Sequence, residues 1–91
     1  MHNTITVNLF RLLLAVIFFA MSAGAQADLQ DATEAYEKGN YPAALKEFRR
    51  LAVSGDATAQ YNLGMMYHKG QGVAQDFKEA AVWYRYAVKQ G

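Results

Sequence analysis

The sequence contains no cysteine, and this absence excludes several classes of protein. No disulfide can form, the commonest structural zinc sites lack their ligands, and no cysteine is present to carry a lipid anchor. Disulfide scaffolds, cysteine-ligated zinc domains and lipoproteins are therefore excluded.

Enzyme motifs are also missing. The chain has no Ser-x-x-Lys, Gly-x-Ser-x-Gly, His-Glu-x-x-His or phosphate-binding loop. His68 has no acidic residue three or four positions away, which favours a surface residue over a base or a metal ligand. We expect no catalysis, cofactor or metal. A hydrolase that uses the carboxylates of Asp31 and Glu34, or of Asp76 and Glu79, is the alternative from the enzyme class, but these spacings are typical of helix caps.

The chain also lacks an excess of either charge and a long hydrophobic run. The net charge is +1, and without residues 1–27, which hold only Arg11, eight basic and eight acidic residues are left. Nucleic-acid binding needs a basic excess and is not expected. The apolar run at 12–21 is about half the length of a membrane-spanning helix.

The order of residues at the N-terminus is typical of a secretory signal peptide. Arg11 precedes the apolar run, and the triplet Ala25-Gln26-Ala27 follows it, so the expected cut is after Ala27. Residues 23–25 offer a second site, and an uncleaved anchor or a core helix are the alternatives. The expected location is periplasmic or secreted, with no membrane attachment after cleavage.

The rest of the sequence contains a repeat. Six residues with the spacing of an amphipathic helix recur 36 positions later. The first set is Tyr41, Ala44, Leu45, Phe48, Leu51 and Ala52, and the second is Phe77, Ala80, Ala81, Tyr84, Ala87 and Val88. Tyr36, Lys38 and Gly39 likewise match Tyr67, Lys69 and Gly70 at an offset of 31. Such a period indicates stacked helix pairs.

We therefore predict helices at about 29–38, 41–53, 57–69 and 77–90. Asn40, Asp56 and Asp76 are the expected N-caps, and Asp76 with Glu79 resembles a capping box. Pro42 lies in a first turn, where its missing N–H is tolerated.

Small residues and aromatics are expected to form the core. The small ones are Ala32, Ala35, Ala43, Ala44, Ala52, Ala59, Gly64, Ala80, Ala81 and Ala87, and the large ones are Tyr36, Phe48, Tyr67, Trp83 and Tyr84. Gly64 costs about 1 kcal/mol within a helix, so we expect it to allow close approach of a neighbour.

From Ala59 to Gly91 the sequence resembles a Sel1-like repeat. The matching positions are Ala59, Leu63-Gly64, Tyr67, Gly70-x-Gly72-Val73, Asp76, Ala80, Trp83-Tyr84, Ala87 and Gly91. Residues 32–55 are similar to a tetratricopeptide-type or degenerate Sel1-like half, but they lack the Gly-x-Gly-Val loop. In that loop, Gly70 and Gly72 permit positive φ or close backbone approach, and Val73 can pack between helices.

The resemblance implies an all-α fold, a right-handed α-solenoid of two helix-turn-helix repeats after a signal peptide. Residues 1–27 would be the signal, 28–55 the degenerate helix pair and 56–91 the Sel1-like repeat. It also implies a non-catalytic module for protein–protein interaction or assembly in the bacterial envelope. A truncated fragment of a longer repeat protein is the alternative, because relatives usually stack more repeats.

Two surfaces are candidates for a protein or peptide partner. By analogy with tetratricopeptide repeats, the first helix of each pair lines a groove, with the candidate residues Gln30, Glu34, Glu37, Thr58, Tyr61, Met65 and His68. A solvated face that binds nothing is the alternative. Trp83, Tyr86 and Val88 are expected to form an apolar patch that receives a further repeat, a partner or a second copy through self-association.

Overall fold

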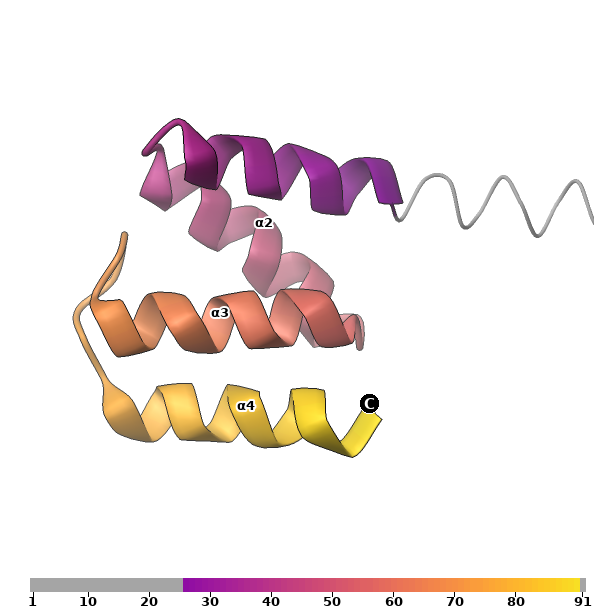
Figure 1. Cartoon of the computed structure of the whole chain (residues 1–91), viewed down its shortest axis with the longest axis vertical. Helices are drawn as coiled ribbons and strands as arrows, with labels where there is room; N and C mark the ends of the chain where they lie inside the picture. The colour runs from indigo at the N-terminus through magenta and orange to yellow at the C-terminus, as the bar shows by residue number, and fades with distance from the viewer. Residues whose placement is uncertain (1–25, 91) are drawn as a thin grey trace, which may run out of the picture.

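The computed structural model describes residues 26–90, and these residues form an all-α fold of helix pairs, as the repeat predicts (Figure 1). Residues 26–37 are helical, and α2 (Tyr41–Val53), α3 (Ala57–Lys69) and α4 (Phe77–Gln90) follow. The last three ranges agree with the predicted ones. The first differs, because the chain is already helical at residue 26, three residues before the expected start. Nearly all of the predicted signal peptide lies outside the described residues.

The helices are arranged as two hairpins. The N-terminal helix (26–37) turns back into α2, and α3 and α4 lie side by side in opposite directions (Figure 1). The largest contacts between the labelled helices join α3 to α4 and α2 to α3. α3 therefore has two partners, its own hairpin mate and the second helix of the preceding hairpin.

One hydrophobic core runs through both hairpins. Its buried members are Ala32, Ala44, Leu45, Phe48, Leu51, Ala52, Ala59, Leu63 and Met66. Partly buried side chains pack around this cluster, namely Leu29, Ala35, Tyr36, Tyr41, Tyr67, Val73 and Trp83. Five of the predicted alanines and Phe48 are buried, so small residues do bring the helices together.

Gly64 lies where α3 and α4 meet most closely. A Cβ atom there would be 2.8 Å from two ring carbons of Tyr84 and 3.2 Å from the carbonyl oxygen of Ala80. Such distances are shorter than van der Waals contact, so a side chain at 64 would push α4 away. The close approach predicted for Gly64 is confirmed, and its neighbour is Tyr84.

The loop between α3 and α4 contacts the first hairpin. Gly70 and Gly72 both have left-handed backbone, with φ of 69° and 73°. A Cβ on Gly72 would be 2.8 Å from the carbonyl carbon and oxygen of Tyr41, at the start of α2. The Tyr36 hydroxyl donates a hydrogen bond of 2.9 Å to Oε1 of Gln71. The loop is therefore anchored on the first hairpin.

Two of the three predicted N-cap side chains make cap hydrogen bonds. Asp56 Oδ1 accepts a hydrogen bond from the Ala59 N–H at 2.8 Å, and Asp76 Oδ1 accepts from the N–H groups of Lys78 and Glu79. The return half of the predicted capping box is replaced, because the Asp76 N–H donates to the Tyr67 carbonyl.

Asn40 occupies the N-cap position of α2 as predicted, but its side chain makes no cap hydrogen bond, so that part of the prediction was wrong. The physical reason lies in the first turn of the helix. Cap side chains accept from the second or third N–H of a helix, and Pro42 occupies the second position without an N–H. The backbone of Asn40 also has ψ of 71°, outside the extended conformation typical of a cap.

These caps give a graded stability prediction. Asp56→Ala and Asp76→Ala should each lower the free energy of unfolding by about 1 kcal/mol, because helix N–H groups lose their acceptor. Asn40→Ala is the matched control and should change it by less than about 0.5 kcal/mol. Urea denaturation followed by circular dichroism measures all three, and an equal loss for Asn40→Ala would contradict the cap assignment.

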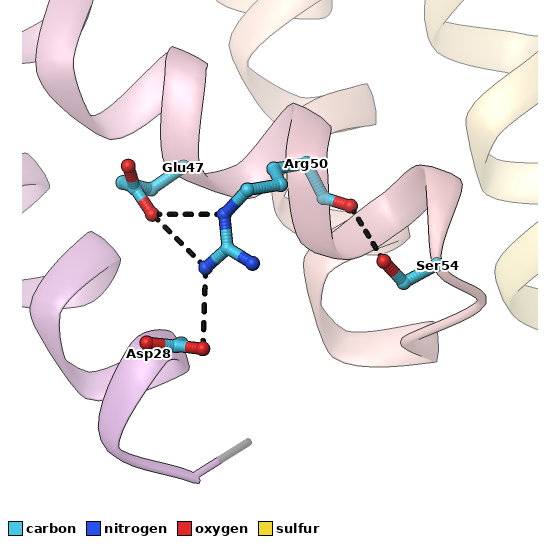
Figure 2. Close-up of polar contacts among 4 residues, drawn as sticks. All are labelled: Asp28, Glu47, Arg50 and Ser54. Atoms are coloured by element: carbon cyan, nitrogen blue, oxygen red, sulfur yellow. Dashed lines mark hydrogen bonds and ion pairs between the residues drawn. The ribbon is translucent and has the colours of Figure 1, made fainter. Parts of the chain in front are cut away.

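An exposed ion-pair cluster joins the N-terminal helix to α2 (Figure 2). One guanidinium nitrogen of Arg50 lies 3.2 Å from both Asp28 Oδ2 and Glu47 Oε2. The hydrogen bond to Asp28, followed by that to Glu47, raises the pKa of Arg50, so its charge is permanent. Exposed ion pairs add little to stability, so we expect this cluster to contribute less to the first hairpin than its buried core does.

Candidate functional site

A broad, open hollow lies between α3 and α4, at the end of the hairpin opposite the glycine loop. Its lining residues, which define the C-terminal groove, are Ala57, Thr58, Tyr61, Tyr84, Ala87 and Val88. Its volume is about 550 Å³. The rings of Tyr61 and Tyr84 meet across the helix pair, with centroids 5.6 Å apart and planes at 42°. The groove is therefore open and mostly apolar, and a pair of tyrosine rings is part of its lining.

Helix spacing explains why these side chains gather. Tyr84, Ala87 and Val88 fall at i, i+3 and i+4 on α4, so they share one face. Val88 is 77% exposed and Tyr61 is 55% exposed, although both are large apolar or aromatic side chains. Burial first, and Tyr61 second, raise the pKa of Tyr84. Its phenol is thus neutral at physiological pH.

The structure places two of the seven predicted partner-binding residues in this groove. Thr58 and Tyr61 line it. Met65 is half-buried, and His68 is exposed with its ring 5.1 Å from that of Phe77. Neither of them lines the groove. The three candidates on the N-terminal helix, Gln30, Glu34 and Glu37, are exposed and also lie outside the lining.

The predicted apolar patch is present in part. Tyr86 and Val88 are exposed as expected, at 50% and 77%. Trp83 is instead half-buried and packs against the core, where its ring lies 5.6 Å from that of Tyr86. Its place in that patch was wrong, because the indole faces α2 and α3 near Ala52 and Gln60.

Tyr84 and Ala87 line the groove but were assigned from the sequence to the core alone. The signal that identifies them is the repeat itself, because their counterparts 36 positions earlier, Phe48 and Leu51, pack against the next helix.

Residues 26–90 were searched for metal-binding groups and for membrane-spanning helices. Among residues 26–90, no three His, Asp or Glu side chains are placed to hold a metal ion. The same residues include no helix with the length and hydropathy needed to cross a membrane. The arrangement presents an apolar surface with charged groups at its edge.

Comparison with known protein families identifies the second hairpin. Residues 57–91 match the family model of the Sel1 repeat. This segment is a Sel1 repeat. It comprises α3, the glycine loop and α4, so the groove lies wholly within it. No curated protein and no solved structure gives a significant match to the chain. Sel1 repeats generally mediate protein interactions and are usually non-catalytic adaptor modules.

Proposed function

We propose that this protein is an exported, non-catalytic interaction module that binds a helical segment of another protein in the C-terminal groove. The observation that carries the proposal is the groove itself, an open apolar hollow formed by both helices of the Sel1 repeat. Exposed apolar patches of this kind are typical of interaction sites.

The shape and chemistry of the groove suit a helix better than a small polar ligand. Its lining combines two aromatic rings with the apolar side chains of Ala87 and Val88. Amphipathic helices bind such surfaces by placing side chains at i, i+3, i+4 and i+7 into them. The edge carries the cations Arg85 and Lys89, which line a neighbouring hollow with Tyr84 and Val88. A helix with an apolar stripe and flanking acceptors would satisfy both features.

Photo-crosslinking in the native host tests this proposal. A photoreactive phenylalanine at Tyr61 should form one discrete adduct with another protein, joined through a helical segment that mass spectrometry identifies. Val88→Asp should lower the adduct yield at least tenfold, because it places a charge in an apolar contact.

The matched control is Lys46→Asp, because Lys46 is exposed on α2 and lines none of these hollows. It should leave the yield unchanged. Adducts only between copies of this chain, or a yield indifferent to Val88→Asp, would overturn the proposal.

The proposed export rests on the N-terminal sequence. A charged residue, an apolar run and an Ala-x-Ala triplet at residues 25–27 support a cleavable signal and a periplasmic or secreted product. Asp28 would then be the first residue of the mature protein, next to the Arg50 cluster.

Intact-mass measurement of protein from the cell envelope tests this point. The expected mass is that of residues 28–91. Ala25→Asp should retain the leader, because Ala25 belongs to both candidate sites and the cut requires small residues, whereas Ala57→Asp should be processed normally. A full-length mass for the unaltered chain would show that residues 1–27 are kept.

A further inference from the structure

The 36-residue repeat relates the C-terminal groove to a surface of the first hairpin that is already occupied. On α2, Phe48, Leu51 and Ala52 are buried in one cluster with Ala59, Leu63 and Met66 of α3. Their counterparts on α4 are Tyr84, Ala87 and Val88, which line the open groove. The groove is thus the repeat copy of the surface on which α3 packs.

The polar edge of the α2–α3 contact has a counterpart as well. A terminal guanidinium nitrogen of Arg49 donates a hydrogen bond of 2.7 Å to the Tyr67 hydroxyl on α3. The counterpart of Arg49 is Arg85, which is exposed and shows no hydrogen bond or ion pair within residues 26–90. Arg85 lines the hollow beside Tyr84 and Val88, so it borders the groove as Arg49 borders α3.

The first residues of α2 and α4 differ in the same way, because the first is covered and the second is exposed. Tyr41 at the start of α2 is covered by the loop at Gly72. Its counterpart Phe77 is 59% exposed. Three features of α2 that hold the second hairpin therefore recur on α4 without the element that would cover them.

A second copy of this chain fits the groove poorly. Its N-terminal helix carries Ala32 and Ala35 at the positions, 31 residues earlier, of Leu63 and Met66. It would place two small side chains in the groove where α3 places two large ones. Pairing of α4 with α4 would bring together Lys78, Arg85 and Lys89 of each copy against one anion, Glu79. Like charges at close range oppose such a dimer. Neither pairing covers the groove well, which leaves it open to the helix of another protein that the proposed function requires.

We propose that this helix follows the pattern of α3 and that Arg85 selects it through one acceptor. The pattern is Ala-x-x-x-Leu-x-x-Met, as at Ala59, Leu63 and Met66, followed at once by a residue with a phenol or carboxylate oxygen. That oxygen accepts a hydrogen bond from Arg85, as the Tyr67 hydroxyl does from Arg49. The inference rests on the proposed function and adds the partner's sequence pattern to it.

The probe is a peptide with the α3 sequence, residues 56–70, stapled across the positions of Tyr61 and Met65. These positions lie about 200° around the helix from Leu63, so the staple leaves the docking face open. A second peptide carries Phe at the Tyr67 position and thus lacks the acceptor. Fluorescence anisotropy measures the binding of each to the full chain.

The expected result is a double-mutant cycle with strong coupling. The Tyr peptide should bind the unaltered chain about tenfold more tightly than the Phe peptide, because a hydrogen bond to a charged donor is lost. Arg85→Met should bind both peptides with equal, weaker affinity. Lys78→Met is the matched control, since it removes a cation elsewhere on α4, and it should preserve the tenfold preference.

The outcomes separate this inference from the proposed function. Binding without coupling between Arg85 and the acceptor would overturn the role of Arg85. Absence of peptide binding, while the Tyr61 crosslink to another protein persists, would overturn the α3 pattern but leave the interaction module standing. Loss of the crosslink's dependence on Val88 would overturn the proposed function itself.

Discussion

Replacing Phe48 by alanine should remove most of the protein's free energy of unfolding at 25 °C. Phe48 is 2% exposed, lies on α2 and packs in the cluster that joins both hairpins. Truncation of a buried phenylalanine costs about 3–5 kcal/mol. A domain of this size has a total stability of about 5 kcal/mol. One substitution therefore removes most of the free energy that keeps the chain folded.

Urea denaturation followed by circular dichroism measures this effect against Val53→Ala. Val53 is on the same helix but 73% exposed, so its truncation should change the free energy of unfolding by less than about 0.5 kcal/mol. Tyr84→Ala, at the repeat counterpart of Phe48, should cost less than Phe48→Ala because Tyr84 is only half-buried. Equal losses at positions 48 and 84 would mean that the groove is closed in solution.

The helix pattern was predictable from the sequence because strong local signals agree with the packing. The spacing of Tyr41, Phe48 and Leu51 defines one apolar face. Asp56 and Asp76 mark two helix starts, and their carboxylate oxygens accept hydrogen bonds from N–H groups of the first turn, as predicted. The positive φ of Gly70 and Gly72 followed from their position in a short loop between helices.

Contacts between distant residues were not predictable in the same way. The sequence indicated that Gly64 has a close neighbour but did not identify Tyr84, because that depends on the angle between α3 and α4. The pairing of Asp28 with Arg50 has no local sequence signal. Trp83 was assigned both to the core and to the outer patch, and only the packing of α4, which places the indole against the core, decides between them.

For the candidate site as well, part of the lining could be predicted from the sequence and part could not. The repeat offset carries the information that Tyr84, Ala87 and Val88 correspond to buried residues of the first hairpin. Thr58 and Tyr61 lie in the groove, whereas Gln30, Glu34 and Glu37 are on the N-terminal helix, away from its lining. The binding stripe was predicted on the first helix of each pair alone, whereas the groove is formed by the first and second helix of one hairpin.

Gly72→Ala should separate the loop from the first hairpin, and Gly39→Ala isolates the reason. Both glycines have left-handed backbone, with φ of 73° and 77°, so alanine costs about 1 kcal/mol at each from backbone strain. A Cβ at 39 meets nothing within 4 Å, whereas a Cβ at 72 would be 2.8 Å from the Tyr41 carbonyl. Backbone atoms cannot rotate away, so overpacking adds about 1–3 kcal/mol at Gly72.

The expected loss in the free energy of unfolding is therefore about 1 kcal/mol for Gly39→Ala and about 3 kcal/mol for Gly72→Ala. Urea denaturation measures both, and hydrogen exchange locates the damage. The hydrogen bond from Tyr36 to Gln71 crosses the same contact, so Gly72→Ala should speed exchange at residues 70–76 and in the first turn of α2. Equal losses for the two variants would show that backbone conformation alone requires Gly72, and that the loop does not hold the hairpins together.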